Sequence, residues 1–301
     1  MGGEILAVDL SSVPIFSWSV SRYKLYNGCK RAYFYNYYLS NTSSLTNCYE
    51  QIKILKKLKR LKNIDLIVNQ SFLDGLTQTF STPGRKNRRN IQGKFLKSAI
   101  CELKKNFTSS SADGISDIYE VVYDELSLND AFEKALFLLK EAVSRFENTE
   151  LFDELLDVSY VNIKQFIPPI YAYFNGIRIW ARPALMWTAL GEQHVLNVAL
   201  GDKNNTYPIS LGISAIYLAQ RTNSSYNSIK SRKLFLGDTS EVYEGQLQIE
   251  DLVEYVAETS TEMLDLVLGR DFIDEFMFQK CDNAQVCEKC KFLMFCNKRS
   301  N

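Results

Sequence analysis

Three cysteines close to the C-terminus constrain this chain more than any other feature of its sequence. They occur as Cys287-x2-Cys290-x5-Cys296 in a chain of 301 residues. The two-residue gap lets two thiolates reach one centre from a tight turn, and the five-residue gap returns the third after about one helical turn. A four-coordinate site needs one more ligand, for which Cys29 and Cys281 are candidates. The spacing predicts a metal site, and small buried apolar side chains are the alternative.

The composition is that of an ordinary globular protein, with 46% apolar and 23% charged residues. The sequence holds no run of eighteen apolar residues, so we expect no membrane span. Its first residues lack the basic and apolar regions of a secretory signal. Seven cysteines, an odd number concentrated at one end, do not suggest a disulfide framework. These features predict a protein of the reducing cytoplasm with no membrane partner.

Charge is distributed unevenly, although the formal net charge is zero. Residues 1–110 contain 18 Lys and Arg against 6 Asp and Glu, and the remaining residues contain 17 against 29. Clustered cations attract a polyanion such as a nucleic-acid backbone, while a solvated helix face is the alternative. The candidate nucleic-acid-binding residues are Lys56, Lys57, Arg60, Arg85, Lys86, Arg88 and Arg89.

Hydrophobic periodicity and motif content predict four segments. These are 1–45 with the N-terminal candidate ligand, 46–150 as a basic helical region, 151–270 as an α/β core, and 271–301 with the cysteine cluster. Ser19 is placed to cap a short helix that Gly28 ends, and Ser127 is placed to cap a long amphipathic helix. The aromatic-rich stretch over residues 30–38 is expected in the core.

The middle of the chain alternates strands with one helix. A β-rich stretch over 176–187 is followed by a turn at Gly191 and a second strand over 194–200. Pro208 is suited to the first turn of a helix, and residues 232–236 form a further strand. This order of strand, hairpin, strand, helix and strand predicts the α/β class.

The two ends of the chain together resemble a known family. The start reads Ser17-x-Ser19 with Tyr23 and Cys29-Lys-Arg31 following, and it is paired with the terminal cysteine motif. This combination resembles the iron–sulfur branch of the PD-(D/E)XK nuclease superfamily, which includes CRISPR-associated RecB-like exonucleases and the AddB subunit of a bacterial helicase–nuclease. The resemblance implies a restriction-endonuclease-like core with a helical insertion and a [4Fe-4S] cluster that joins the termini, with zinc as the alternative. The implied ligands are Cys29, Cys287, Cys290 and Cys296.

The resemblance also locates the positions where nuclease chemistry belongs. Such nucleases place an aspartate after a proline on one strand and D/E-x-K on the next, so that the carboxylates hold Mg²⁺ or Mn²⁺. Here these positions fall on Ala184 and, 13 residues later, on Asn197 and Ala199. Alanine cannot bind a metal ion and asparagine carries no charge, so the site is expected to be degenerate. A displaced site remains an alternative, with Glu192, Asp202, Lys203 and Asp238 as its candidates.

Together these features predict a catalytically inactive, nuclease-like [4Fe-4S] protein. It is expected to bind single- or double-stranded DNA, or to serve as an architectural subunit, in a complex for recombination, CRISPR adaptation or phage defence. One alternative is an active Mg- or Mn-dependent DNA exonuclease with a relocated site. Another is a protein-interaction subunit that binds no nucleic acid. The sequence has no Walker-type phosphate loop, so no intrinsic ATP-driven motor is expected.

Overall fold

The chain forms two compact units. The computed structural model describes residues 6–42, 49–82, 87–109, 117–159, 163–164, 170–201, 206–237 and 239–298. One unit comprises Met1–Leu61 together with Val253–Asn301, and the other comprises Lys62–Leu252. We call them the terminal unit and the central unit. Both ends of the chain therefore belong to the terminal unit, whereas the central unit is one continuous stretch.

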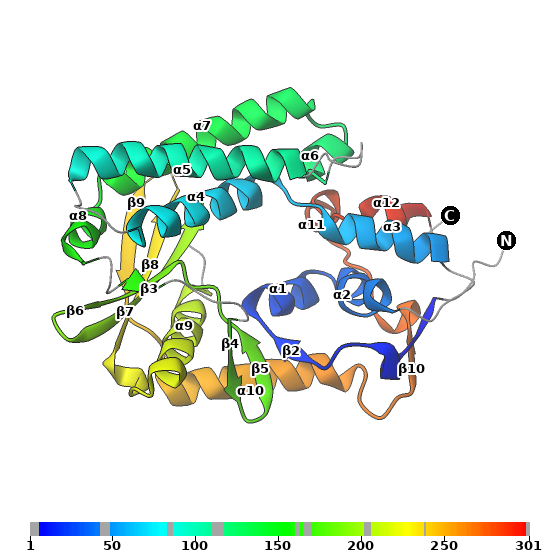
Figure 1. The fold of residues 1–301 in the computed structure, drawn as a ribbon. Helices are drawn as coiled ribbons and strands as arrows, with labels where there is room; N and C mark the ends of the chain where they lie inside the picture. Colours follow the sequence, from blue (N-terminus) through cyan, green and yellow to red (C-terminus); the bar gives the residue numbers. More distant parts are fainter. Residues whose placement is uncertain are drawn as a thin grey trace. The chain divides into compact units, whose positions relative to one another are not determined.

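The terminal unit is built from short strands and helices of both chain ends (Figure 1). Its elements are β1 (Ala7–Asp9), β2 (Ser17–Trp18), α1 (Val20–Gly28), α2 (Lys30–Tyr37), α3 (Tyr49–Arg60), most of α10 (Ile249–Asp265), β10 (Phe272–Asp274), α11 (Ala284–Glu288) and α12 (Leu293–Lys298). Strand β1 pairs antiparallel with β10, with Val8 opposite Ile273. The backbone ladder thus joins segments more than 260 residues apart.

The predicted local features of the N-terminal segment are confirmed. Ser19 caps α1, because its side chain accepts a hydrogen bond from the amide of Arg22 at 3.0 Å, and the helix ends at Gly28. The aromatic stretch that follows lies in the core, as expected: the side chains of Tyr33, Phe34 and Tyr35 are buried. These rings fix α2 against the C-terminal segment, since Phe34 stacks on Phe278 with ring centroids 4.9 Å apart.

The central unit contains a helical layer and a sheet. Its helices are α4 (Ile64–Phe80), α5 (Arg88–Ser109), α6 (Tyr119–Val122), α7 (Leu128–Glu147), α8 (Glu150–Asp157) and α9 (Tyr207–Thr222). Its strands are β3 (Ile163–Lys164), β4 (Tyr171–Phe174), β5 (Ile177–Trp180), β6 (Leu185–Ala189), β7 (Glu192–Leu200), β8 (Ile229–Leu236) and β9 (Ser240–Glu244). The described part of the predicted helical region is helical, and Ser127 caps α7 by accepting a hydrogen bond from the Asp130 amide.

Five strands of the central unit form a mixed sheet in the order β3-β6-β7-β8-β9. Strands β6 and β7 are antiparallel, and β7 and β8 are parallel, with α9 as the crossover between them. One face, including Leu196 and Leu234, packs into the core formed with α4, α5 and α7, and α9 covers the other face (Figure 1). Helices on both faces of a sheet containing a parallel pair confirm the α/β class.

The stretch over 176–187 that was predicted to be β-rich contains strands, but it is interrupted. Strand β5 ends at Trp180 and β6 begins at Leu185, so the stretch divides between two strands. Pro183 lies in the interruption. Proline has no amide hydrogen to donate to a sheet ladder, which explains why pairing stops there. Strand β5 instead pairs with β4 as a hairpin, with Ile179 opposite Ala172.

Candidate metal centre and basic pocket

Cys29 occupies the junction between α1 and α2. Its backbone is extended, its amide donates to the carbonyl of Leu25, and its sulfur accepts a hydrogen bond from the Ala32 amide at 3.4 Å. The sulfur therefore caps the N-terminus of α2 by accepting from an amide of its first turn. The local sequence thus places this cysteine at the junction of two helices.

The C-terminal cysteines lie on a turn and a helix, as their spacing predicts. Asn283 caps α11, and its carbonyl accepts a hydrogen bond from the Cys287 amide at 3.1 Å. The Cys290 amide donates to the Cys287 carbonyl at 3.0 Å, which closes the turn across the two-residue gap. Cys296 lies on α12, and its amide donates to the Phe292 carbonyl at 2.9 Å.

All four predicted ligands line one pocket, together with a fifth cysteine. The pocket has a volume of about 110 Å³, and its cysteines are Cys29, Cys281, Cys287, Cys290 and Cys296. Within the described residues, no group of three or more Cys, His, Asp or Glu side chains is placed to hold a metal ion. The five cysteines line the pocket together with eight other residues. The family resemblance implied four of these residues as ligands, and Cys281 was the other candidate for the fourth position.

Burial and mutual proximity alter the acidity of the pocket thiols. Burial raises the pKa of Cys290 to about 11, and the nearby thiols of Cys29, Cys296 and Cys287 contribute to the increase. Burial also raises the pKa of Cys287, followed by the effects of Cys281 and Cys29. Several thiolates in one small pocket repel one another, so a bound cation is what would stabilise their ionised forms.

Aromatic side chains enclose the inner side of the cysteine pocket. Phe292 and Phe295 are buried, and the Tyr35 ring packs edge-on against Phe295 with centroids 5.1 Å apart. Leu293 also lines the pocket, whereas Met294 is exposed and does not line it. Phe292, Leu293 and Phe295 therefore lie at or beside the pocket.

A buried ion pair adjoins the cysteine pocket and joins the two chain ends. Arg31 Nη1 lies 3.4 Å from Glu275 Oε2, and the Tyr35 hydroxyl donates to the same oxygen at 3.1 Å. Arg31 Nε also donates to the Phe278 carbonyl at 2.7 Å. Because Arg31 and Tyr35 line the pocket, these bonds help to fix its wall.

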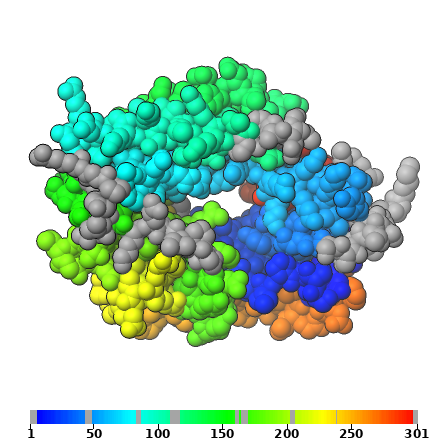
Figure 2. Space-filling model, in the orientation of Figure 1, coloured from blue at the N-terminus to red at the C-terminus, as the bar shows by residue number. Residues whose placement is uncertain are grey.

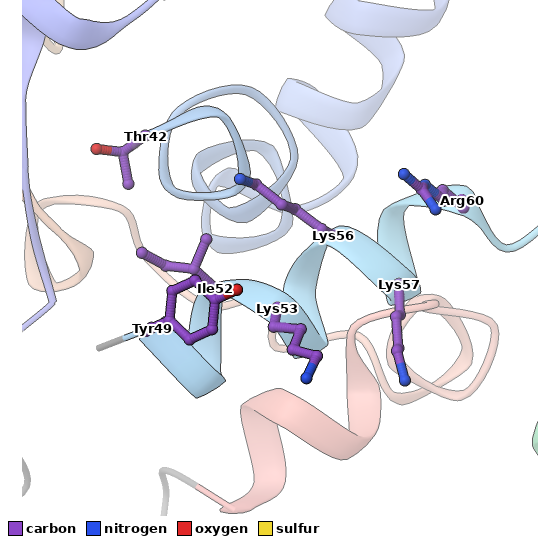
Figure 3. Close-up of a pocket in the computed structure, with 7 residues that line it drawn as sticks. All are labelled: Thr42, Tyr49, Ile52, Lys53, Lys56, Lys57 and Arg60. Carbon is purple, nitrogen blue, oxygen red and sulfur yellow. The ribbon is translucent and has the colours of Figure 1, made fainter. Parts of the chain in front are cut away.

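A second pocket lies along α3 and is strongly basic. It has a volume of about 330 Å³ and is lined by Thr42, Tyr49, Ile52, Lys53, Lys56, Lys57 and Arg60. The side chains of Lys53 and Lys57 extend to one side of the helix, while Lys56 extends toward Thr42 (Figure 3). Helix α3 lies at the surface of its unit (Figure 2). Its four pocket cations are exposed. Within the described residues, these four make no ion pair.

Helix α3 is anchored to the cysteine segment at its C-terminal end. Lys291 Nζ donates to the carbonyl of Lys59 at 2.9 Å, and burial lowers the pKa of Lys291 to about 8. Lys59 itself donates to Asn41 at 2.7 Å, which leaves it half-buried. The amphipathic pattern of α3 accounts for the rest of its placement, since Leu55 and Leu58 are buried away from the pocket and Ile52 is buried at its inner wall.

The second predicted group of cations is described only in part. Arg85 and Lys86 lie outside the described residues. Arg89 is exposed at the start of α5, whereas Arg88 forms an ion pair with Asp153 and donates to the Glu147 carbonyl at 2.7 Å. Arg88 is thus engaged within the central unit, unlike the lysines of the α3 pocket.

The register of β6 and β7 brings the predicted catalytic positions together. Leu185 pairs with Leu196, and the Ala184 amide donates to the Leu196 carbonyl at 2.5 Å, so Ala184 and Asn197 flank this pair at the same end. Asn197 is buried, and its Oδ1 accepts a hydrogen bond from Ser214 on α9 at 3.1 Å. Ala199 follows on the same strand. The three positions are thus filled by packing and a neutral hydrogen bond.

Glu192 is the one candidate for a displaced catalytic site that lies within the described residues, and its surroundings do not support such a site. Glu192 begins β7 and forms an exposed ion pair with Lys230 at 3.8 Å, at the opposite end of the strand from Leu200. The other candidates, Asp202, Lys203 and Asp238, lie outside the described residues. Glu192 therefore has an ordinary surface partner across parallel strands.

Comparison with known proteins leaves this chain without an assigned family. No protein-family model matches it, and no curated protein matches it. The crystal structure of SSO0001 is similar over 60% of this chain and 79% of that chain, with 13% sequence identity and a TM-score of 0.30. So remote a likeness decides neither fold nor function. None of the described helices is both long enough and apolar enough to cross a membrane.

Proposed function

We propose that this protein is a catalytically degenerate PD-(D/E)XK-like protein of the cytoplasm that binds DNA within a larger DNA-processing complex. Its [4Fe-4S] cluster has a structural role and is held by Cys29, Cys287, Cys290 and Cys296. The observation that carries the proposal is the cysteine pocket of the terminal unit. Residues more than 250 positions apart line one pocket, as a cluster joining both chain ends requires.

The size of the cysteine pocket favours a cluster over a single zinc ion. Four thiolates around one ion must all converge on it, whereas each thiolate of a [4Fe-4S] cluster binds a different iron atom. The pocket that these sulfurs line, together with other residues of the terminal unit, has a volume of about 110 Å³. A single ion would leave most of this space unfilled. A bound cluster would cross-link the two chain ends. The aromatic side chains of Tyr35, Phe292 and Phe295 would exclude water from its inner side.

The central unit supports the nuclease-like part of the proposal. An antiparallel β6–β7 hairpin, a crossover helix and a strand parallel to β7 reproduce the order expected for such a core. At the two positions where metal-binding carboxylates belong, one directly before β6 and one on β7, the residues are Ala184 and Asn197. Loss of both carboxylates removes the metal ion that activates water, so no hydrolysis is expected at this point.

The α3 pocket supports binding of a nucleic-acid backbone. Four exposed cations line it without an acidic neighbour among its lining residues, and Tyr49 adds an exposed ring that can stack on a base. Lys56, Lys57 and Arg60 were predicted from the charge run alone. Lys53 and Tyr49 join them because both lie on the same helix face, at spacings of three and four residues.

The iron–sulfur part is tested by measuring iron, zinc and acid-labile sulfide after anaerobic purification, with the visible spectrum recorded alongside. We expect roughly four irons and four sulfides per chain, as in a Cys-ligated [4Fe-4S] cluster. Replacing Cys290 with alanine should abolish both, whereas Cys101→Ala, an exposed cysteine of α5, should change neither. Zinc without sulfide in the wild type would overturn the cluster.

The nucleic-acid part is tested by measuring affinity for labelled single- and double-stranded DNA over a range of salt concentrations. Replacing Lys53, Lys56, Lys57 and Arg60 with neutral residues should weaken binding. The log–log dependence of affinity on salt should become shallower by about 0.9 for each duplex phosphate that the variant no longer neutralises. The matched control replaces Lys134 and Lys140, two exposed lysines of α7, with alanine. Equal effects of the two variants would indicate nonspecific attraction.

The same samples distinguish the two alternative functions. Cleavage of DNA in Mg²⁺ or Mn²⁺ that disappears on replacing Glu192 or Asp202 would establish a relocated exonuclease site. A wild-type protein that binds no DNA but retains its cluster would establish a protein-interaction subunit. We expect that the protein does not cleave DNA and that it binds DNA through α3 with an affinity that depends on salt.

A further inference from the structure

The cysteine pocket contains one thiol more than a [4Fe-4S] cluster uses. Five cysteines line it, and the resemblance to known proteins accounts for four. Cys281 is the fifth. It is half-buried, like the other four, rather than pointing away on an exposed surface.

Cys281 is tied closely to Cys287. The Cys287 sulfur lies 3.6 Å from the Cys281 carbonyl oxygen, toward which it can donate. Asn283 connects the two residues, because its amide donates to the Cys281 sulfur at 3.3 Å and its carbonyl accepts from the Cys287 amide at 3.1 Å. The two thiols thus belong to one short, hydrogen-bonded loop that opens α11.

This loop forms the solvent edge of the pocket. The residues between the two cysteines, 282–286, are all exposed. The opposite wall is different, since Cys290 is followed by the buried Phe292, and Cys296 lies beside the buried Phe295. Water and small reagents can therefore reach the Cys281–Cys287 side more readily than the aromatic side.

We propose that Cys281 is a reserve ligand that exchanges with Cys287 at the solvent edge of the cluster. This inference rests on the proposed iron–sulfur function. In the exchange, the bond between iron and the Cys287 sulfur breaks and a bond to the Cys281 sulfur forms. The proton of the Cys281 thiol passes to the departing Cys287 thiolate, so charge is conserved and no oxidant or reductant is needed. The cluster stays attached while one ligand leaves.

Alanine variants test the exchange through iron and sulfide content and through the electron paramagnetic resonance of the reduced protein. Cys287→Ala should retain most of its iron and sulfide with an altered spectrum, because Cys281 replaces the missing ligand. Cys290→Ala, on the buried side, should lose the cluster. The double variant Cys281→Ala/Cys287→Ala should lose it as Cys290→Ala does, whereas Cys281→Ala alone should keep a normal cluster.

Alkylation of the wild-type protein provides a second test that needs no variant to fold. Iodoacetamide is applied to the cluster-loaded protein, and the labelled cysteines are identified by peptide mass spectrometry over time. Exchange predicts that label accumulates on both Cys281 and Cys287 while the cluster absorbance persists and Cys290 stays protected. Label confined to Cys281 would overturn the exchange.

The outcomes separate this inference from the proposal on which it rests. If the wild type contains zinc or no metal, both the cluster and the exchange are overturned. If the wild type contains the cluster but Cys287→Ala loses iron as completely as Cys290→Ala, only the exchange is overturned. A double variant that retains as much iron as Cys287→Ala would also overturn it, because Cys281 would then not be the replacement.

Discussion

The terminal and central units differ in which side chains occupy the positions where the family resemblance places chemistry. In the terminal unit all four expected ligand positions are cysteines, and they line one pocket. In the central unit the expected carboxylate positions hold Ala184 and Asn197, and Asn197 bonds to Ser214 beneath α9. In the terminal unit cysteines line a pocket. In the central unit the corresponding positions hold the buried side chains of Ala184 and Asn197.

The two units also differ in the interactions that stabilise them. The terminal unit is assembled from two distant chain segments, so it depends on long-range bonds such as the Arg31–Glu275 pair. The central unit has a large apolar core in which α4, α5 and α7 pack together and against the sheet. We therefore expect the terminal unit to respond to the removal of polar links and metal, and the central unit to respond to altered packing.

The largest effect among the stability variants is expected from Glu275→Gln. The change leaves the Arg31 guanidinium buried without its carboxylate partner, at a cost of about 3–5 kcal/mol. It should lower the free energy of unfolding measured in urea and release iron from the adjacent pocket. Glu262→Gln is the control, because Glu262 also accepts from a tyrosine hydroxyl, at 3.3 Å, but at an exposed position. Similar losses of stability in the two variants would contradict the importance of burial.

A smaller effect, in the other unit, is expected from Gly75→Ala. A Cβ at this position of α4 would lie 2.7 Å from the Ala99 backbone on α5, so the helices must separate. Overpacking of this kind costs about 1–3 kcal/mol, partly offset by up to about 1 kcal/mol from the higher helix propensity of alanine.

Gly93→Ala is its matched control on α5, because nothing lies within 4 Å of an added Cβ there. Urea unfolding should show Gly75→Ala destabilised and Gly93→Ala unchanged or more stable. Both should keep their iron. Release of iron by Gly75→Ala alone would show that the two units are not stabilised separately.

The smallest effect is expected at His194, the single histidine of the chain. It is buried on β7 and stacks on Trp187 with ring centroids 5.0 Å apart. Burial is the main cause that lowers the pKa of His194, and the charge of Arg232 adds to it. The carboxylates of Glu154, Glu192 and Glu244 act in the opposite direction. Because the unfolded chain takes up this proton first as pH falls, stability is lost on acidification below about pH 6.5. At neutral pH the contribution is fully present.

His194→Phe keeps an aromatic ring against Trp187 and removes this titration. The difference in unfolding free energy between wild type and variant should therefore shift in favour of the variant between about pH 7.5 and pH 5.5. Each unit by which folding lowers the pKa corresponds to about 1.4 kcal/mol. A difference that is the same at both pH values would show that His194 does not titrate differently in the folded chain.

Sequence patterns predicted the local structure of both units well where the signal was periodic or involved a cap. Ser19 and Ser127 cap the helices expected of them, Pro208 lies in the first turn of α9, and the aromatic stretch after Cys29 is buried. The interruption of the β-rich stretch over 176–187 was not predicted, because the alternation of side chains continues through Pro183, where the hydrogen-bonded ladder cannot. The sequence showed the runs of cations but not which of them form ion pairs. Among the described residues, Arg88 is in an ion pair and Lys56 is not.

The sequence by itself determined the cysteine spacing, the helical periodicity, the concentration of cations and the absence of carboxylates at Ala184 and Asn197. These are properties of neighbouring residues, and neighbours suffice to set caps, turns and helix faces. Tertiary structure alone decided that both candidates for the fourth ligand, Cys29 and Cys281, line the cysteine pocket. It also decided that Tyr49 and Lys53 complete the α3 pocket and that Asn197 bonds to α9. Each depends on side chains brought together by burial of distant apolar surfaces, which no short window of sequence encodes.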